Sequence, residues 1–167
     1  AEDILLIEFG HNDQKRKGKG IGPWASYTDY LIEYVEKARA KGAIPVVISP
    51  IQRRFFNKDG TVKNTHGDYP AAVRKVAADL DIPLIDLTEL TRQMYEAWGV
   101  EGSKRAFMHY PEGFYPGQAT ALADNTHHNS FGAFEIAHCV VEELLNWDLG
   151  LEDKLNDGYR PYQASAP

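Results

Sequence analysis

The chain has 167 residues, enough for one domain with a buried core, and 43% of them are hydrophobic and 25% charged. Its net charge of −6 argues against nucleic acid as a main partner, because binding phosphates requires a basic surface. No apolar run approaches the roughly 20 residues that cross a bilayer, so the sequence predicts no membrane span.

Strands and helices are predicted to alternate along the chain, as in a parallel α/β sheet with right-handed crossovers. Three nearly continuous apolar runs predict strands buried on both faces, at residues 4–9, 44–49 and 82–86. Apolar side chains at helical spacing predict four helices, at about residues 24–40, 69–80 and 89–98, and from Asn129 or Ser130 onward. Asp68 and Thr88 are the predicted N-caps of the second and third helices.

The segments between these elements are predicted from their turn-forming residues. Lys58-Asp59-Gly60 predicts a surface hairpin within a turn-rich stretch. Residues 101–108 are expected to add a helical turn or two, and the proline and glycine content of 109–117 predicts an aromatic loop. We expect residues 1–148 to form one domain portion and the polar residues 149–167 to form a C-terminal appendage.

The residues suited to catalysis fall in two short motifs. Gly10-His11-Asn12-Asp13 follows the first predicted strand, at the edge where open α/β sheets place their ligands. Asp124-Asn125-Thr126-His127 precedes the last helix, and an acid three residues before a histidine can orient the imidazole as a general base. Two alternatives for the second motif are a cap at Asp124 with an ordinary polar histidine, and a metal site that also uses His128.

The two motifs, in this order and with strands and helices between them, resemble those of the SGNH (GDSL-type) hydrolase superfamily. Its third block is Gly-x-Asn-Asp and its fifth is Asp-x-x-His. The surrounding residues, Phe9 and Gln14 beside the first motif and Asn129, Gly132 and Ala133 after the second, are similar to the rhamnogalacturonan acetylesterase-like branch. The resemblance covers about residues 3–147. It implies a flavodoxin-like, three-layer α/β fold that lacks its N-terminal strands in this chain.

The resemblance implies catalytic roles for three residues. His127 would be the general base that takes the proton from a serine nucleophile, and Asp124 would orient the ring and stabilise the imidazolium. The Asn12 side chain would donate to the tetrahedral oxyanion, a contact worth about 3 kcal/mol in other hydrolases. No metal ion and no organic cofactor are implied.

Five further residues are implied to contact or shape the substrate site. Gly10 would let the turn pass close to the substrate, and Asp13 would brace the loop by bonding to its backbone. His11 occupies a variable position and would either line the cleft or pack. Tyr110 and Phe114, from the aromatic loop, would suit stacking on a sugar ring.

The nucleophile that the resemblance requires is absent from the sequence. In the family it is the serine of a Gly-Asp-Ser block at the end of the first strand, and no serine here follows Gly-Asp. Ser49 ends a predicted strand, but Pro50 follows it directly, unlike a nucleophile elbow. We therefore expect the chain to begin at the family's third strand and to be inactive or nearly so by itself, since losing a catalytic serine costs about a millionfold elsewhere.

The absence of preceding strands predicts an exposed edge. The strand from Ile4 to Phe9 would then carry unpaired backbone groups and uncovered apolar side chains. We expect either self-association or a separate N-terminal segment to cover it.

The function implied by the resemblance is a carbohydrate O-acetylesterase with a serine acyl-enzyme mechanism. Its substrate would be an acetylated pectic or other polysaccharide, and its location the periplasm or the outside of the cell. Two alternatives stay open: a non-catalytic carbohydrate-binding or interaction module on the same fold, and a lipase-like esterase with a non-carbohydrate substrate. A Gly-Asp-Ser block upstream would favour an enzyme, and comparing acetylated pectin with longer acyl esters would separate the two esterases.

Overall fold

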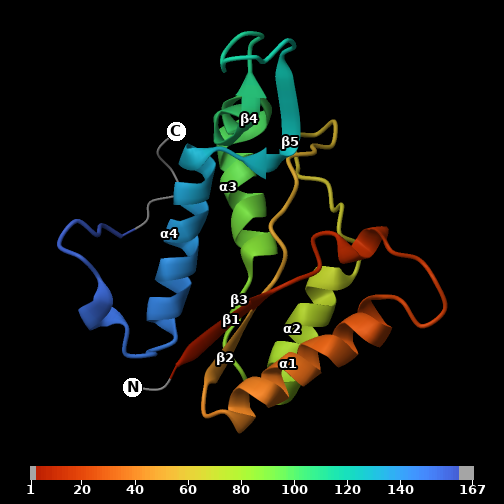
Figure 1. Cartoon of the computed structure of the whole chain (residues 1–167), viewed down its shortest axis with the longest axis vertical. Helices are drawn as coiled ribbons and strands as arrows, with labels where there is room; N and C mark the ends of the chain where they lie inside the picture. The colour runs from red at the N-terminus through yellow and green to blue at the C-terminus, as the bar shows by residue number, and fades with distance from the viewer. Residues whose placement is uncertain (1–2, 162–167) are drawn as a thin grey trace. The chain divides into compact units, whose positions relative to one another are not determined.

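The computed structural model describes residues 3–161, which form two compact units (Figure 1). Within the described range, the first unit comprises residues 3–51 and 66–88, and the second comprises residues 52–65 and 89–161. None of the helices in residues 3–161 has the length and apolar character needed to cross a membrane. The predicted boundary at residue 148 stays a prediction, and residues 162–167 of the predicted appendage lie outside the described range.

A parallel sheet forms the centre of the first unit, as predicted. Its strands are β1 (Ile4–Glu8), β2 (Ile44–Ile48) and β3 (Leu84–Ile85), in the order β1-β2-β3. Among residues 3–161, β1 pairs only with β2, and its Leu5 and Leu6 are 41% and 44% exposed, whereas the last four residues of β2 are buried. The predicted edge is therefore present, and the third layer of the predicted fold stays a prediction.

Two helices, α1 (Thr28–Ala40) and α2 (Tyr69–Leu80), lie side by side in the first unit (Figure 1). Their apolar faces pack with β1 and β2 into one buried core, which includes Ile7, Leu31, Val35, Val47, Val73 and Val76. The predicted start of the first helix at Trp24 is wrong. Ala25 leaves helical backbone angles within the irregular turn Pro23–Tyr27, and the regular helix begins only at Thr28.

Both predicted side-chain caps in this unit are wrong. Asp68 precedes α2 but makes no capping bond, and its carboxylate instead accepts from Trp24 Nε1 over 3.2 Å. Thr88 lies inside α3 (Leu87–Gly102), and its hydroxyl donates to the Pro50 carbonyl over 2.6 Å. In each case the side chain forms a hydrogen bond with a residue distant in sequence and does not cap the backbone of its own helix.

The second unit contains α3, the short 3-10 turn Ser103–Ala106, and the strands β4 (Phe107–Tyr110) and β5 (Leu122–His128). It also contains α4 (Ser130–Asn146) and a final 3-10 turn, Glu152–Lys154. Asn129 caps α4, because its side chain accepts from the Gly132 N–H over 3.0 Å. The predicted surface hairpin is also present, since Phe56 bridges Val62 and Gly60 has φ of 85°.

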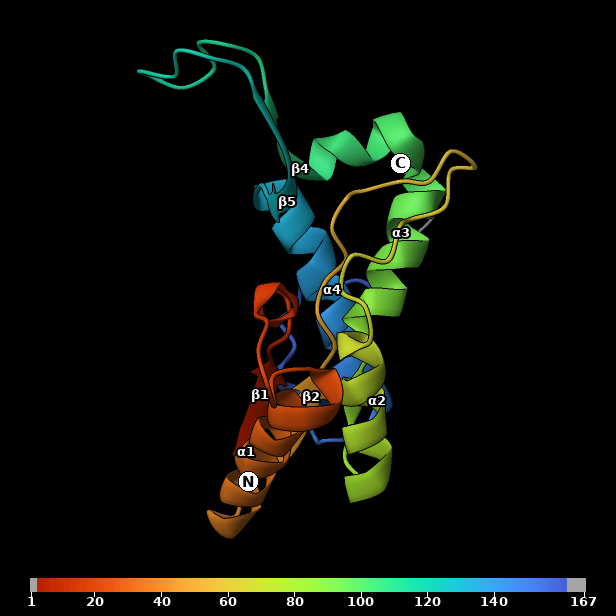
Figure 2. The ribbon, with the colours of Figure 1, turned by 90° about the vertical axis from the view of Figure 1, so that its right-hand side faces the viewer.

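The antiparallel pair β4–β5 was not predicted from the sequence. The predicted loop at 109–117 is wrong in its first two residues, because His109 and Tyr110 belong to β4 and pair with Ala123 and Leu122. Asp124-Asn125-Thr126-His127 consequently lies within β5, at a local turn where the register of the β4–β5 ladder shifts, and not at the entrance of the helix. The loop between the strands extends beyond both of them (Figure 2).

Candidate active site

Asp124 and His127 form a hydrogen-bonded pair on β5. The His127 Nδ1 lies 2.6 Å from Asp124 Oδ2, while Asp124 Oδ1 accepts the backbone N–H groups of Thr126, at 2.6 Å, and His127, at 3.0 Å. The carboxylate therefore holds the turn and the ring together. Because Nδ1 is engaged and the His127 side chain is 77% exposed, the ring presents Nε2 as its proton-transfer atom.

The pKa of Asp124 is set by two opposing effects. Partial burial raises the pKa. Hydrogen bonds from the His127 ring and from the backbone N–H groups of His127 and Thr126 lower it by a larger amount, so the pKa falls from 3.8 to about 2. Asp124 is therefore ionised at neutral pH and acts only as an acceptor toward His127. This is the state in which a carboxylate fixes an imidazole tautomer and stabilises an imidazolium.

His128 points away from this pair, as predicted. Its Nε2 lies 2.8 Å from the hydroxyl of the fully buried Tyr95, and its ring lies 4.3 Å from that of Phe107. His128 belongs to the paired end of β5, opposite Phe107, whereas residues 124–127 lie where the register of the β4–β5 ladder shifts. Within residues 3–161, no three His, Cys, Asp or Glu side chains are grouped so as to hold a metal ion.

The motif after β1 is a tight, internally bonded turn in the first unit. Asp13 Oδ2 accepts from the Gly10 N–H over 3.1 Å, which is the backbone brace predicted for Asp13. Gly10 has φ of +107°, and a Cβ there would lie 2.8 Å from the hydroxyl oxygen of Tyr27, which donates to the Phe9 carbonyl. Only glycine fits both the backbone angle and this close approach.

Asn12 is held by a lysine that follows it by three residues. Lys15 Nζ donates to Asn12 Oδ1 over 2.7 Å. Since an ammonium group can only donate, the bonded amide atom is the oxygen, and the Asn12 amide nitrogen is left to donate elsewhere. The sequence showed Lys15 only as part of a basic cluster, although its spacing from Asn12 could have indicated the contact.

His11 packs against a second histidine. Its Nδ1 lies 3.3 Å from Nε2 of the fully buried His66, and the two ring centres are 4.9 Å apart. His11 therefore contacts His66, and neither of the two open possibilities for it is decided by this contact. A role in binding substrate stays a prediction.

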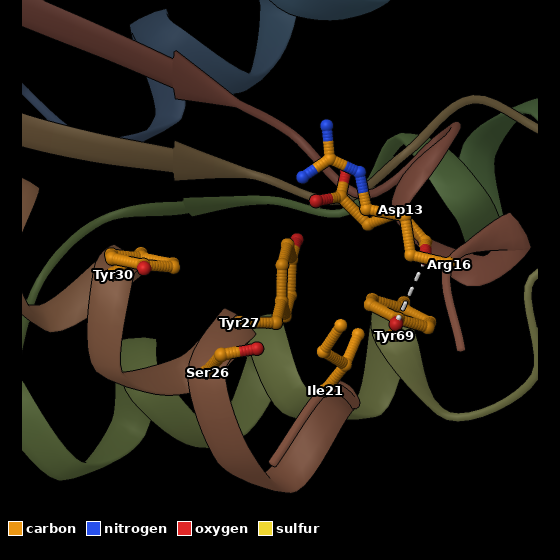
Figure 3. Close-up of a pocket in the computed structure, with 7 residues that line it drawn as sticks. All are labelled: Asp13, Arg16, Ile21, Ser26, Tyr27, Tyr30 and Tyr69. Atoms are coloured by element: carbon orange, nitrogen blue, oxygen red, sulfur yellow. Dashed lines mark hydrogen bonds between the residues drawn. The ribbon is translucent and has the colours of Figure 1, made fainter. Parts of the chain in front are cut away.

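A pocket of about 210 Å³ adjoins the same motif (Figure 3). Tyr27, Tyr30 and Tyr69 line it, and Asp13 and Arg16 contribute its charged groups. The Tyr69 hydroxyl donates to the Asp13 carbonyl over 3.2 Å and so ties the wall of the pocket to the turn. Aromatic faces beside a few charged groups are a lining suited to a polar organic ligand.

The aromatic residues of the β4–β5 loop form a compact cluster. Tyr110 stacks on Phe114 with ring centres 4.4 Å apart, and Tyr115 packs edge-on against both rings. Gln118 organises the loop by donating to the Pro111 and Thr120 carbonyls. Phe114 and Tyr115 remain 54% and 43% exposed, so the loop presents ring surface to solvent.

Ser49 is not arranged as a nucleophile. Its side chain is fully buried, its hydroxyl donates to Asp86 Oδ1 over 2.7 Å, and it accepts the Thr88 N–H over 2.9 Å. Arg74 occupies the same Asp86 carboxylate with two further bonds. The serine thus serves a structural network at the ends of β2 and β3.

The predicted site residues fall into two groups, one in each unit. Gly10, His11, Asn12 and Asp13 lie together in the first unit, and Asp124 and His127, with Tyr110 and Phe114, belong to the second. Their meeting in one site stays a prediction.

Arg54 contacts the second motif but was not predicted from the sequence. Its only indication there is a pair of adjacent arginines among apolar residues.

The chain is similar to proteins that are named rhamnogalacturonan acetylesterases. It is 41% identical over 153 residues to the rhamnogalacturonan acetylesterase RhgT of Bacillus subtilis, covering 92% of this chain and 65% of RhgT. It is 31% identical over 156 residues to YesY of the same organism, named a probable rhamnogalacturonan acetylesterase, covering 92% and 67%. The chain thus spans about two thirds of the length of these relatives. No protein-family profile matches it.

Solved structures share the fold. The crystal structure of the Bacillus subtilis protein YXIM superposes with a TM-score of 0.71 at 23% identity, covering 88% of this chain and 38% of that one. A candidate acylhydrolase of Bacteroides fragilis gives a TM-score of 0.51 at 15% identity, covering 87% and 62%. At these identities the likeness concerns the fold alone.

Proposed function

Since the chain belongs to the SGNH hydrolase superfamily, in its rhamnogalacturonan acetylesterase-like branch, we propose that it is the acid-base and oxyanion portion of a carbohydrate O-acetylesterase. The observation that carries the proposal is the 2.6 Å bond between Asp124 and His127. Their spacing is that of the family's fifth block. An ionised carboxylate bonded to one imidazole nitrogen leaves the other free to take a proton at neutral pH.

In the proposed reaction His127 Nε2 removes the proton from a serine hydroxyl, whose oxygen attacks the carbonyl carbon of an acetyl ester. The charge that develops on the carbonyl oxygen is met by the Asn12 amide N–H. As the tetrahedral intermediate collapses, His127 returns the proton to the departing sugar oxygen and an acetyl-serine remains. Water, activated by the same histidine, then hydrolyses the acetyl-serine to acetate.

The serine of this mechanism belongs to a Gly-Asp-Ser block that the 167 residues do not contain. We propose that a further segment of the protein supplies it, and that the chain alone does not turn over ester. Without that segment, no nucleophile is present to attack the ester beside Asp124, His127 and Asn12. Turnover of p-nitrophenyl acetate by the 167-residue chain, abolished by His127→Ala, would contradict this.

The proposed substrate is an acetylated polysaccharide of the pectic type, as the names of RhgT and YesY suggest for those proteins. The exposed rings of Phe114 and Tyr115 support it, because aromatic faces stack on the apolar faces of sugars. Gly10, His11, Asp13 and Tyr110 are the further proposed contacts or supports. An enzyme with such a substrate would work in the periplasm or outside the cell.

The proposed partner of β1 is another strand. Leu5 and Leu6 are 41% and 44% exposed on β1, which pairs only with β2 among residues 3–161. A further segment of the same protein would cover this edge in the active enzyme. In the 167-residue chain alone, a second copy would take its place.

The test is acetate release from acetylated rhamnogalacturonan by the protein that joins this chain to a Gly-Asp-Ser segment. The proposal predicts release of acetate, and slower cleavage of p-nitrophenyl esters as the acyl chain lengthens. Faster cleavage of long acyl esters would favour a lipase-like enzyme. Binding of the polysaccharide without any acetate release would favour a non-catalytic module.

A further inference from the structure

Arg54 is a buried cation that makes its contacts with uncharged groups. It is 6% exposed, and its Nε donates to Ser103 Oγ over 2.9 Å while Nη2 donates to the Val100 carbonyl. None of the ion pairs among residues 3–161 includes this guanidinium, and the charge of Glu101 acts on it only from a longer distance. Burying a charge is costly unless it is hydrogen-bonded, and three of the five guanidinium N–H groups donate to Ser103, Val100 and Asn125, which holds the side chain in position.

The remaining bonds of Arg54 go to the residue that follows Asp124. Arg54 Nη1 donates to Asn125 Oδ1 over 2.7 Å, and the Arg54 backbone N–H donates to the Asn125 carbonyl over 2.8 Å. One residue therefore holds both the side chain and the backbone of Asn125. It does so inside the turn between Asp124 and His127.

His109 completes the arrangement from the neighbouring strand. Its Nε2 lies 2.9 Å from the same Asn125 Oδ1. Because Arg54 can only donate, that Asn125 atom is the oxygen, so His109 Nε2 must carry a proton and donate as well. Two donors from separate segments thus converge on one acceptor in the Asp-x-x-His turn.

We propose that Arg54 is a positioning residue for the Asp124–His127 pair and acts through Asn125. The exposed His127 ring is held by Asp124, whose Oδ1 in turn depends on the backbone N–H groups of Thr126 and His127. A shift of the turn moves those donors and the carboxylate together. Displacing a reacting group by about 1 Å costs on the order of 100-fold in rate.

Matched variants separate this role from a general need for a buried arginine. Arg54→Met keeps the length of the side chain and removes its donors, and Asn125→Leu removes the acceptor at similar volume. Arg53→Met is the control, because Arg53 is equally buried, at 6% exposure, and donates to Thr65 Oγ1 over 3.2 Å.

The first readout requires no turnover and uses the 167-residue chain labelled with ¹⁵N-histidine. NMR gives the rate at which the His127 Nδ1 proton exchanges with water, which the bond to Asp124 slows. We expect Arg54→Met and Asn125→Leu to speed this exchange at least tenfold, and Arg53→Met to change it less than twofold. Unchanged exchange in Arg54→Met, or equal acceleration in Arg53→Met, overturns the proposal. If Arg54→Met does not fold, Asn125→Leu decides by the same criterion.

The second readout rests on the proposed function and uses the protein completed by its serine segment. Each single variant should lower kcat about 100-fold, and the double variant should be no more than threefold slower than the slower single one. If the loss of kcat in the double variant equals the product of the two single losses, Arg54 does not act through Asn125 and the proposal is overturned. If the serine-containing native protein shows no turnover while the NMR result is as expected, the proposed esterase function is refuted. The positioning role of Arg54 then remains supported.

Discussion

Lys15 and Asn12 are joined by a 2.7 Å hydrogen bond that orients the side chain expected to meet the oxyanion. The ammonium holds the amide oxygen, and the amide N–H groups are directed away from it. Without Lys15, the Asn12 carboxamide is free to rotate and to present its oxygen to the developing negative charge. The orientation of this donor therefore depends on a residue outside the family's third block.

Lys15→Met should lower kcat about tenfold with KM little changed, because the lost interaction is made in the transition state. Asn12→Ala should cost more, roughly 100- to 1,000-fold, as does loss of an oxyanion donor elsewhere. Lys17→Met, in the same basic loop, is the control. Steady-state kinetics on the serine-containing protein measures all three, and equal effects of Lys15→Met and Lys17→Met would refute the orienting role.

The lowered pKa of Asp124 predicts a contribution to stability that depends on pH. Its ordinary value of 3.8 falls to about 2 in the folded chain, where bonds from His127 and Thr126 outweigh the opposing effect of burial. A group whose pKa falls on folding stabilises above its unfolded pKa, and that stability is lost as pH drops through the folded pKa. As the pH falls from about 4 to 2, the free energy of unfolding of the native chain should therefore decrease. The Asp124→Asn variant has no carboxylate at this position, so its stability should not show this contribution. Thermal unfolding at pH 5 and pH 2 measures this, and a constant difference in Tm between the two proteins would contradict it.

Gly132 is required by close packing of α4 against the turn before β4. A Cβ at this position would lie 2.1 Å from the Ala106 carbonyl oxygen and 3.0 Å from a carbon of the His128 ring. Alanine favours a helix over glycine by about 1 kcal/mol, but the backbone carbonyl must move to admit it. Gly132→Ala should lower the free energy of unfolding by about 1–3 kcal/mol in urea titrations. Ala137→Ser, on the exposed side of α4, is the control, and equal stability of the two variants would refute the packing argument.

The open edge at β1 predicts self-association of the 167-residue chain. Leu6 is 44% exposed on β1, which has one neighbouring strand within the described part of the chain, and a lysine there opposes pairing with a second copy. Sedimentation velocity should show a larger mass for the native chain than for Leu6→Lys. Val100→Lys, at a position equally exposed, should leave the mass unchanged. A well-folded native monomer at all concentrations would refute the prediction.

The sequence predicted those features that depend on local patterns. The bounds of α2, the three parallel strands and the cap at Asn129 follow from apolar spacing and turn chemistry. The β4–β5 pair was missed because its strands are separated by a loop whose prolines and glycines dominate the local composition. Arg54 was missed for a related reason, since its acceptor lies 71 residues away and no motif records the contact. Local patterns predicted the Asp124–His127 contact but not the residues that hold it.

The most direct test of the account is the turnover of acetylated rhamnogalacturonan by His127→Ala in the protein that includes the serine segment. We expect a loss of kcat on the order of 10⁵- to 10⁶-fold, as for removal of the histidine in another serine hydrolase. His138→Ala, a histidine on α4 outside the motif, should stay within threefold of the native protein. Retention of turnover by His127→Ala, or an equal loss in His138→Ala, would contradict the assignment of Asp124 and His127 as the acid-base pair.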